Sequence, residues 1–216
     1  MRVVIATIAV IMLNTLSAQH TWVSNHDANG LSAGITEVDF SGLNQSLMQQ
    51  GVQGFDNQIF MAGWDAVRTA NISGITASFD AMSSLSFMLR ETRSNGTGPI
   101  SYRMRGWQYV TSTFGKDVIP GDAIALVLAP GVVWGNIKLD RKVGNIETLY
   151  TNPVVAPMVR AELRIKLWRL VLGGRAFYRY DLTDAKWKRK DDLMPVLNGT
   201  RQHGLGMQVF LLWHKK

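Results

Sequence analysis

Charged side chains recur at every second position in several stretches of this 216-residue sequence. The clearest run is 157–169, where Arg160, Glu162, Arg164 and Lys166 alternate with apolar residues. Successive side chains of a β-strand point to opposite faces, so this spacing predicts a strand with one charged face and one apolar face. A charged face of this kind can attract anions, or it can pair its own charges. The charges that we assign to such faces are Arg103, Arg105, Arg160, Glu162, Arg164, Lys166, Arg175 and Arg179.

Other patterns that could carry chemistry are missing from the sequence. There is no cysteine, which removes thiol catalysis, cysteine-ligated metals and disulfides. The sequence has no GxSxG or HExxH motif and no glycine-rich phosphate loop after a strand. His203 and His214 have no assignable acidic partner. We therefore expect neither enzymatic activity nor a cofactor. The net charge of +7 is dispersed along strands, so we expect no nucleic-acid partner.

The charged stretch 157–169 is also too long for an ordinary strand. It is about twice the usual strand length in a soluble protein but matches a tilted membrane-spanning strand of roughly 9–11 residues. The apolar residues of 174–182 and 202–213 alternate in the same way. With these faces toward lipid and the charges toward a lumen, the sequence predicts an all-β fold, an antiparallel transmembrane β-barrel.

The lengths of the connections between the predicted strands support the barrel. Membrane barrels have short turns on the periplasmic side and long loops outside. Counting back from the C-terminus places every short connection on one side. The short connections are near 69–70, 115–121 and 170–173, and the long ones are 83–99, 140–153 and 183–200.

The strand count decides how the interior charges are interpreted. Seven strands are clear, and Leu31–Val38 would make the even number that bacterial barrels use. We predict eight strands, with ten as the alternative if 122–139 contains another. An eight-stranded barrel is just wide enough to be filled by its own side chains. Both an anion-attracting lumen and a lumen packed with ion pairs therefore stay open.

The N-terminal part divides into two predicted regions before the barrel. Residues 1–18 have a basic start, an apolar core and the cleavage-like Leu16-Ser17-Ala18, as in a secretory signal peptide. Residues 19–56 form an N-terminal segment, and 57–216 would form the barrel.

Within the N-terminal segment, 39–51 predicts a short helix. Asp39 or Ser41 can cap it, and Phe40, Leu43 and Leu47 line one side. Two to three turns cannot stand alone in water. We expect this helix to dock in the barrel mouth or against its periplasmic end.

Three of these features resemble outer-membrane β-barrel proteins common in Bacteroidota. They are the signal ending in Leu16-Ser17-Ala18-Gln19, the helix that begins Asp39-Phe40-Ser41-Gly42, and a final strand Gly204–Phe210 that leads directly to the terminus. The resemblance is one of pattern over nearly the whole chain, although this chain ends Trp213-His214-Lys215-Lys216 rather than in a terminal aromatic residue. It implies export to the bacterial outer membrane, contact with outer-membrane lipid, and handling by the outer-membrane assembly machinery. It implies no catalytic residue.

These patterns lead to one expected function and two alternatives. We expect an outer-membrane barrel with a structural or transport-related role. One alternative is a secreted or periplasmic β-sandwich or lipocalin-like binding protein, whose apolar faces would point inward. The other is a small lipid-modifying barrel enzyme in the outer membrane.

Overall fold

The structure is a computed structural model that describes most of the chain after residue 26. The described residues are 27–70, 75–84, 91–93, 100–119, 123–184, 186–191, 195–197 and 199–214. The signal peptide expected at 1–18 lies outside them.

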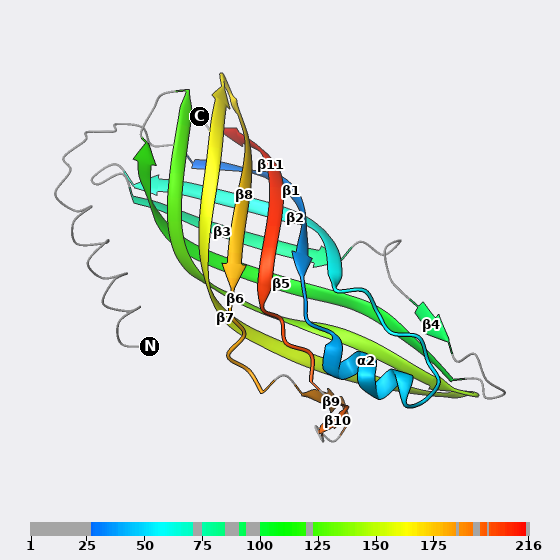
Figure 1. Cartoon of the computed structure of the whole chain (residues 1–216). Helices are drawn as coiled ribbons and strands as arrows, with labels where there is room; N and C mark the ends of the chain where they lie inside the picture. The colour runs from blue at the N-terminus through cyan, green and yellow to red at the C-terminus, as the bar shows by residue number, and fades with distance from the viewer. Residues whose placement is uncertain are drawn as a thin grey trace, which may run out of the picture.

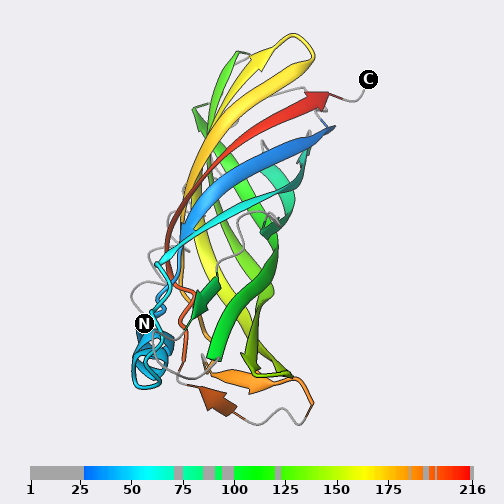
Figure 2. The same cartoon turned by 90° about the vertical axis from the view of Figure 1, so that its right-hand side faces the viewer.

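Eight antiparallel strands form a closed barrel (Figure 1). Each strand pairs with the next along the circuit, and β1 pairs with β11 to close it, as Ala33 opposite Val209 illustrates. The two strands lie side by side in Figure 2. The eight strands of the circuit are β1 (Asp27–Glu37), β2 (Gln58–Ala70), β3 (Ile75–Ser84), β5 (Ile100–Ile119), β6 (Ile124–Val143), β7 (Ile146–Leu167), β8 (Leu170–Arg179) and β11 (Gly204–His214).

This circuit decides two of the sequence expectations. The count of eight is confirmed, and the alternative of ten is wrong because the remaining strands stand outside the circuit. Three short strands flank it: β4 (Glu91–Arg93) pairs with β5, β9 (Trp187–Arg189) pairs with β7, and β10 (Pro195–Leu197) pairs with β9. Since β1 is part of the circuit, the barrel begins at Asp27 rather than at residue 57.

The alternation of β7 is the one predicted from its sequence. From 152 to 163 its side chains are alternately buried and exposed, with Arg160 and Glu162 inside and Val159 and Leu163 outside. The strand ends at Leu167, two residues earlier than predicted, because Trp168 and Arg169 form the turn to β8.

The two ends of the barrel differ as expected from the loop lengths. One end of the barrel holds the start of β1 and the end of β11, together with the ends of β2, β5 and β7 and the starts of β3, β6 and β8. We call this the short-turn end and its opposite the loop end. Two of the predicted short connections were misplaced. The residues 69–70 belong to β2 and are not a turn, and the residues 115–119 belong to β5. The expected long loop at 140–153 is also wrong. Strands β6 and β7 continue through it as a hairpin around Gly144, whose φ of 58° suits glycine.

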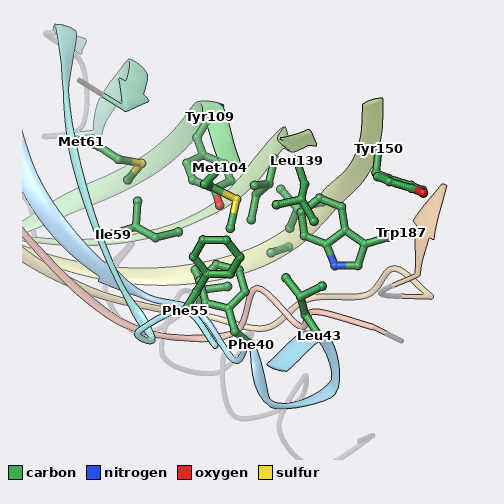
Figure 3. Close-up of a cluster of buried hydrophobic side chains, with 14 of the residues drawn as sticks. Phe40, Leu43, Phe55, Ile59, Met61, Met104, Tyr109, Leu139, Tyr150 and Trp187 are labelled. Atoms are coloured by element: carbon green, nitrogen blue, oxygen red, sulfur yellow. The ribbon is translucent and has the colours of Figure 1, made fainter. Parts of the chain in front are cut away.

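Helix α2 (Ser41–Met48) closes the loop end and is shorter than the predicted 39–51. Leu43 and Leu47 are fully buried in a cluster with side chains from β5, β6 and β7. In Figure 3, Phe40, Leu43 and Phe55 point toward barrel residues such as Met104. The helix therefore docks in the barrel mouth at the loop end, which we call the outer mouth, and not at the short-turn end. Among the described residues, no helix is long and apolar enough to cross a membrane.

Polar contacts hold α2 in the mouth. The Asn44 side chain makes two bonds to the backbone of Phe55, accepting from its N–H at 2.7 Å and donating to its carbonyl at 2.8 Å. Asp39 Oδ1 accepts a hydrogen bond from the Ser41 backbone N–H at 2.9 Å. Hydrogen bonds from Ser41 hold the pKa of Asp39 below its usual value, the side-chain bond having the largest effect.

Candidate functional site: the ionic cluster inside the barrel

Five buried charged side chains from four strands meet inside the barrel, and we call them the ionic cluster. Asp65 comes from β2, Asp80 from β3, Arg160 and Glu162 from β7, and Arg175 from β8. Each sits on the inward-facing side of its strand, between exposed neighbours such as Trp64 before Asp65 or Val159 before Arg160. The alternation of each strand thus places these charges in the lumen.

Arg175 is the centre of the ionic cluster. Its guanidinium lies 2.5 Å from Asp80 Oδ1 and 3.1 Å from Glu162 Oε2, and it also pairs with Asp65. Its Cζ stands 4.4 Å from the centre of the Phe210 ring, a cation–π contact. One side chain therefore joins β8 to β2, β3, β7 and β11.

Arg160 ties the cluster to β5 as well. Its Nη1 lies 2.8 Å from Asp80 Oδ2, and its Nη2 lies 3.2 Å from Glu162 Oε2. The same Nη2 donates to Thr113 Oγ1 at 2.7 Å and to the Ser78 hydroxyl. These contacts link β7 to β3 and β5, and they pair a buried charge that would otherwise be costly.

The charges of the ionic cluster and its nearest neighbour balance. Arg164 Nε lies 2.5 Å from Glu162 Oε1, so three arginines face the three carboxylates. A balanced set presents little net field to an anion entering the lumen. This geometry favours a packed interior over an anion-attracting one.

A second polar layer lies between the ionic cluster and the loop end. Arg179 stands over the Tyr109 ring with its Cζ 4.6 Å from the ring centre. The Tyr109 hydroxyl donates to Gln202 Oε1, and Gln202 Nε2 donates to Asn152 Oδ1 at 2.7 Å. The cavity lined by both layers has a volume of about 10 Å³, which is room for about one water molecule.

The charges predicted to face the lumen differ in how far they are buried in the structure. Arg160, Glu162, Arg175 and Arg179 are buried inside the barrel. Arg164 and Lys166 follow on the same face of β7 toward the short-turn end and are partly exposed.

The other two charges predicted to face the lumen are Arg103 and Arg105. Arg103 is exposed and does not line the lumen, because β5 has a register shift between Met104 and Gly106. A β-bulge of this kind reverses which residues face inward. The side chain of Arg105 lies outside the described part of the structure.

Sequence reasoning missed both aspartates of the ionic cluster. Asp65 and Asp80 are each the one acidic residue of strands β2 and β3, which otherwise contain mainly apolar and small residues. A lone carboxylate at an inward position of such a strand requires a buried cation. That requirement is the signal that could have linked them to the arginines of β7 and β8.

The carboxylates of the ionic cluster are paired with arginine side chains. Among the described residues, no group of three His, Cys, Asp or Glu side chains is arranged to hold a metal ion. The oxygen atoms of Asp80 and Glu162 already contact guanidinium groups at 2.5–3.2 Å.

Comparisons with known proteins agree with the barrel. No protein-family model and no curated protein matches the sequence. The outer membrane protease OmpT from Escherichia coli is similar in structure with a TM-score of 0.50 and 9% identity, over 93% of this chain and 100% of that one. Neisserial surface protein A gives a TM-score of 0.48 and 8% identity, over 88% and 97% of the two chains.

A third similar structure is Ail, the attachment invasion locus protein of Yersinia pestis, solved with the heparin analogue sucrose octasulfate. It gives a TM-score of 0.45 and 11% identity, over 88% of this chain and 98% of that one. At such identities the likeness to OmpT is one of fold alone. The chain is thus a closed, eight-stranded antiparallel barrel of the architecture found in outer-membrane proteins.

Proposed function

We propose that this chain is an integral outer-membrane protein with a filled lumen and a structural role, and that it is neither an open channel nor an enzyme. The observation that carries the proposal is the outer surface of the barrel. Each of the eight strands exposes at least one large apolar side chain on it, from Leu31 on β1 to Leu211 on β11. A soluble monomer rarely exposes a continuous apolar surface of this size.

The height of the apolar surface fits a bilayer. On β7 it extends from Val155 to Leu167, which is about 40 Å along the strand. At a strand tilt of about 40° this corresponds to about 30 Å along the barrel axis, close to the hydrocarbon thickness of a membrane.

Aromatic side chains lie toward both limits of the apolar surface. Trp168 at the β7–β8 turn is 84% exposed, and Trp213 lies near the end of β11. Toward the loop end, Trp134, Tyr178 and Tyr180 are exposed. Tryptophan and tyrosine prefer the interfaces between lipid and water, so both sets fit aromatic belts.

The interior supports a structural role over transport. The ionic cluster fills the lumen, and α2 with its apolar cluster fills the outer mouth. A lipocalin-like binder needs a ligand cavity and inward apolar faces, whereas the cavity beside the ionic cluster has room for about one water.

Several parts of the proposal come from the sequence alone. They are the Bacteroidota-type origin, the cleaved signal peptide, and handling by the outer-membrane assembly machinery. N-terminal sequencing of the exported protein checks the signal peptide: we expect a mature chain that starts at Gln19.

Fractionation followed by gel electrophoresis tests the membrane proposal. We expect the protein in the outer-membrane fraction after an alkaline wash, and we expect unheated samples to migrate differently from boiled ones because a closed barrel resists detergent. A soluble protein with no shift would contradict the proposal and favour the secreted binding protein.

Conductance tests the proposal of a filled lumen. Reconstituted protein should give no stable current steps in planar bilayers, because side chains block the path at two levels. Steady ion-conducting steps from protein that shows the gel shift would make it a channel instead.

A further inference from the structure

A row of basic side chains crosses three neighbouring strands near the loop end. Lys138 of β6 pairs with Thr151 of β7, and Thr151 pairs with Lys188 of β9. Residues directly opposite each other in antiparallel strands share a face, so all three lie on one face. Ile137 and Leu139, the neighbours of Lys138, are fully buried, so this face is the outer one.

Strand β9 is held firmly in this position. Trp187 is fully buried in the apolar cluster of the outer mouth, and its Nε1 donates to Thr200 Oγ1 at 2.9 Å. Because Trp187 points inward, the next residue, Lys188, points outward. Lys186 and Lys190, which flank β9, are exposed. We call Lys138, Lys186, Lys188 and Lys190 the lysine row.

The lysine row continues the apolar surface of the barrel. Trp134 of β6 and Val155 of β7 are paired, exposed and on the same face as the row. Leu182 is also exposed, and its backbone N–H donates to the Val155 carbonyl at 3.0 Å. The β6–β7 register has no shift between these positions, so the face is continuous. Four residues, or about 13 Å along the strand, separate Val155 from Thr151.

Three carboxylates lie near the lysine row without fully balancing it. Asp184 Oδ2 stands 3.7 Å from Lys188 Nζ, and the buried Asp140 lies two residues from Lys138 on the same face of β6. The exposed Asp191 follows Lys190 directly in the chain. Four lysines against three carboxylates leave one excess positive charge just beyond the apolar surface.

We propose that the lysine row binds the phosphate groups of an anionic glycolipid in the outer leaflet, with its acyl chains against Trp134, Val155 and Leu182. This inference rests on the proposed membrane location. A lipid fits better than a soluble polyanion because the apolar and basic parts of the face are continuous and in the order that acyl chains and headgroup require. Lysines beside a membrane extend their ammonium groups to the headgroup level and attract anionic lipid.

Native mass spectrometry of the folded protein in mild detergent tests the inference. The probe is bisphosphorylated lipid A, compared with the same lipid after removal of its phosphates. The wild-type protein should retain the phosphorylated form preferentially. The variant K138Q/K186Q/K188Q/K190Q should retain it about tenfold more weakly, since each lysine near an anionic surface contributes to the attraction.

Two further variants complete the test. K166Q/R169Q removes two cations from the short-turn end and should retain lipid A as the wild type does. K186Q/K190Q changes only exposed positions, so we expect it to fold even if the fourfold variant does not. Its retention of phosphorylated lipid A should lie between that of the wild type and that of the fourfold variant.

Three outcomes would overturn the inference. They are unchanged retention in the lysine variants, equal retention of the lipid without phosphates, and binding of a soluble sulfated oligosaccharide in place of lipid A. A normal gel shift on boiling with any of these outcomes leaves the membrane proposal standing. A wild-type protein without the gel shift would overturn the membrane proposal itself.

Discussion

Arg175 makes ion pairs inside the barrel with three carboxylates from three other strands. Its contribution is specific because a lysine has no planar fork of donors to reach all three. Replacement of a buried ion pair as a whole can be neutral, but removal of one partner leaves uncompensated charge in a medium of low dielectric constant. Substitution of Arg175 therefore tests whether the lumen is packed with ion pairs.

At this residue we predict that Arg175→Met destabilises the barrel by about 3–5 kcal/mol. The physical reason is that Asp65, Asp80 and Glu162 lose the cation at their centre. Urea unfolding of the protein in lipid vesicles measures the free energy of unfolding. Arg103→Met is the matched control, because Arg103 is exposed, and it should change that free energy by less than about 0.5 kcal/mol. Equal effects of the two changes would mean that the ionic cluster is not buried as described.

At the scale of the elements, the stability of α2 depends on the side chains of its buried face. Leu43 and Leu47 contribute no exposed surface, whereas Met48 is 64% exposed. Eight residues are too few for a helix that is stable in water, so α2 exists because it packs in the outer mouth.

We therefore predict that Leu43→Ala costs about 2–5 kcal/mol of stability, since it leaves a cavity in the apolar cluster. Met48→Ala, on the exposed side of the same helix, should cost little. The comparison uses urea unfolding, together with protease sensitivity of the segment 38–57 in intact barrels. Resistance of that segment in Leu43→Ala equal to the wild type would show that α2 is not held by this contact.

The outer surface of the strands gives a second prediction for the elements. Leu163 lies in the apolar surface of β7, and Ile146 lies at the far end of the same strand with 72% of it exposed. Leu163→Arg should destabilise the barrel by about 2–4 kcal/mol, because arginine at mid-depth in a bilayer is unfavourable. Ile146→Arg, in water at the hairpin tip, should change the stability little. In vesicles, near-identical unfolding curves for the two variants would argue against a lipid-facing surface.

The strands were predictable to the extent that one face was apolar and the other polar. Residues 157–167 and the last strand satisfy that condition, and both are strands. The hairpin at 140–153 does not satisfy that condition. It extends beyond the apolar surface, so its outward-facing side chains are not apolar and polar and apolar residues no longer alternate. The bulge after Met104 had no sequence signal, and it reversed the face of Arg103. The ionic cluster was predicted only in part. Its basic residues alternate with apolar residues in the sequence, whereas each of its aspartates is the one acidic residue of a strand of mainly apolar and small residues.

For the whole molecule, the two ends and the middle have separate roles. Short turns and an exposed tryptophan mark one end, whereas α2, β9 and the β6–β7 hairpin build the other (Figures 1 and 2). The middle is apolar outside and ionic inside, which is the reverse of a soluble protein. This reversal is the basis of the membrane location, the filled lumen and the lipid site that we propose.

Site-directed spin labelling tests the reversal most directly, and the absence of cysteine in the chain makes single labels simple to introduce. Labels replace Val155, Val159 and Leu163 on the outer face of β7, with Ile146 as the control in water. In lipid vesicles we predict that the first three labels collide with dissolved oxygen more than with a water-soluble nickel complex, most strongly at Leu163, and that the label at 146 does the opposite. Preferential collision of the labels at 159 and 163 with the nickel complex would contradict the account.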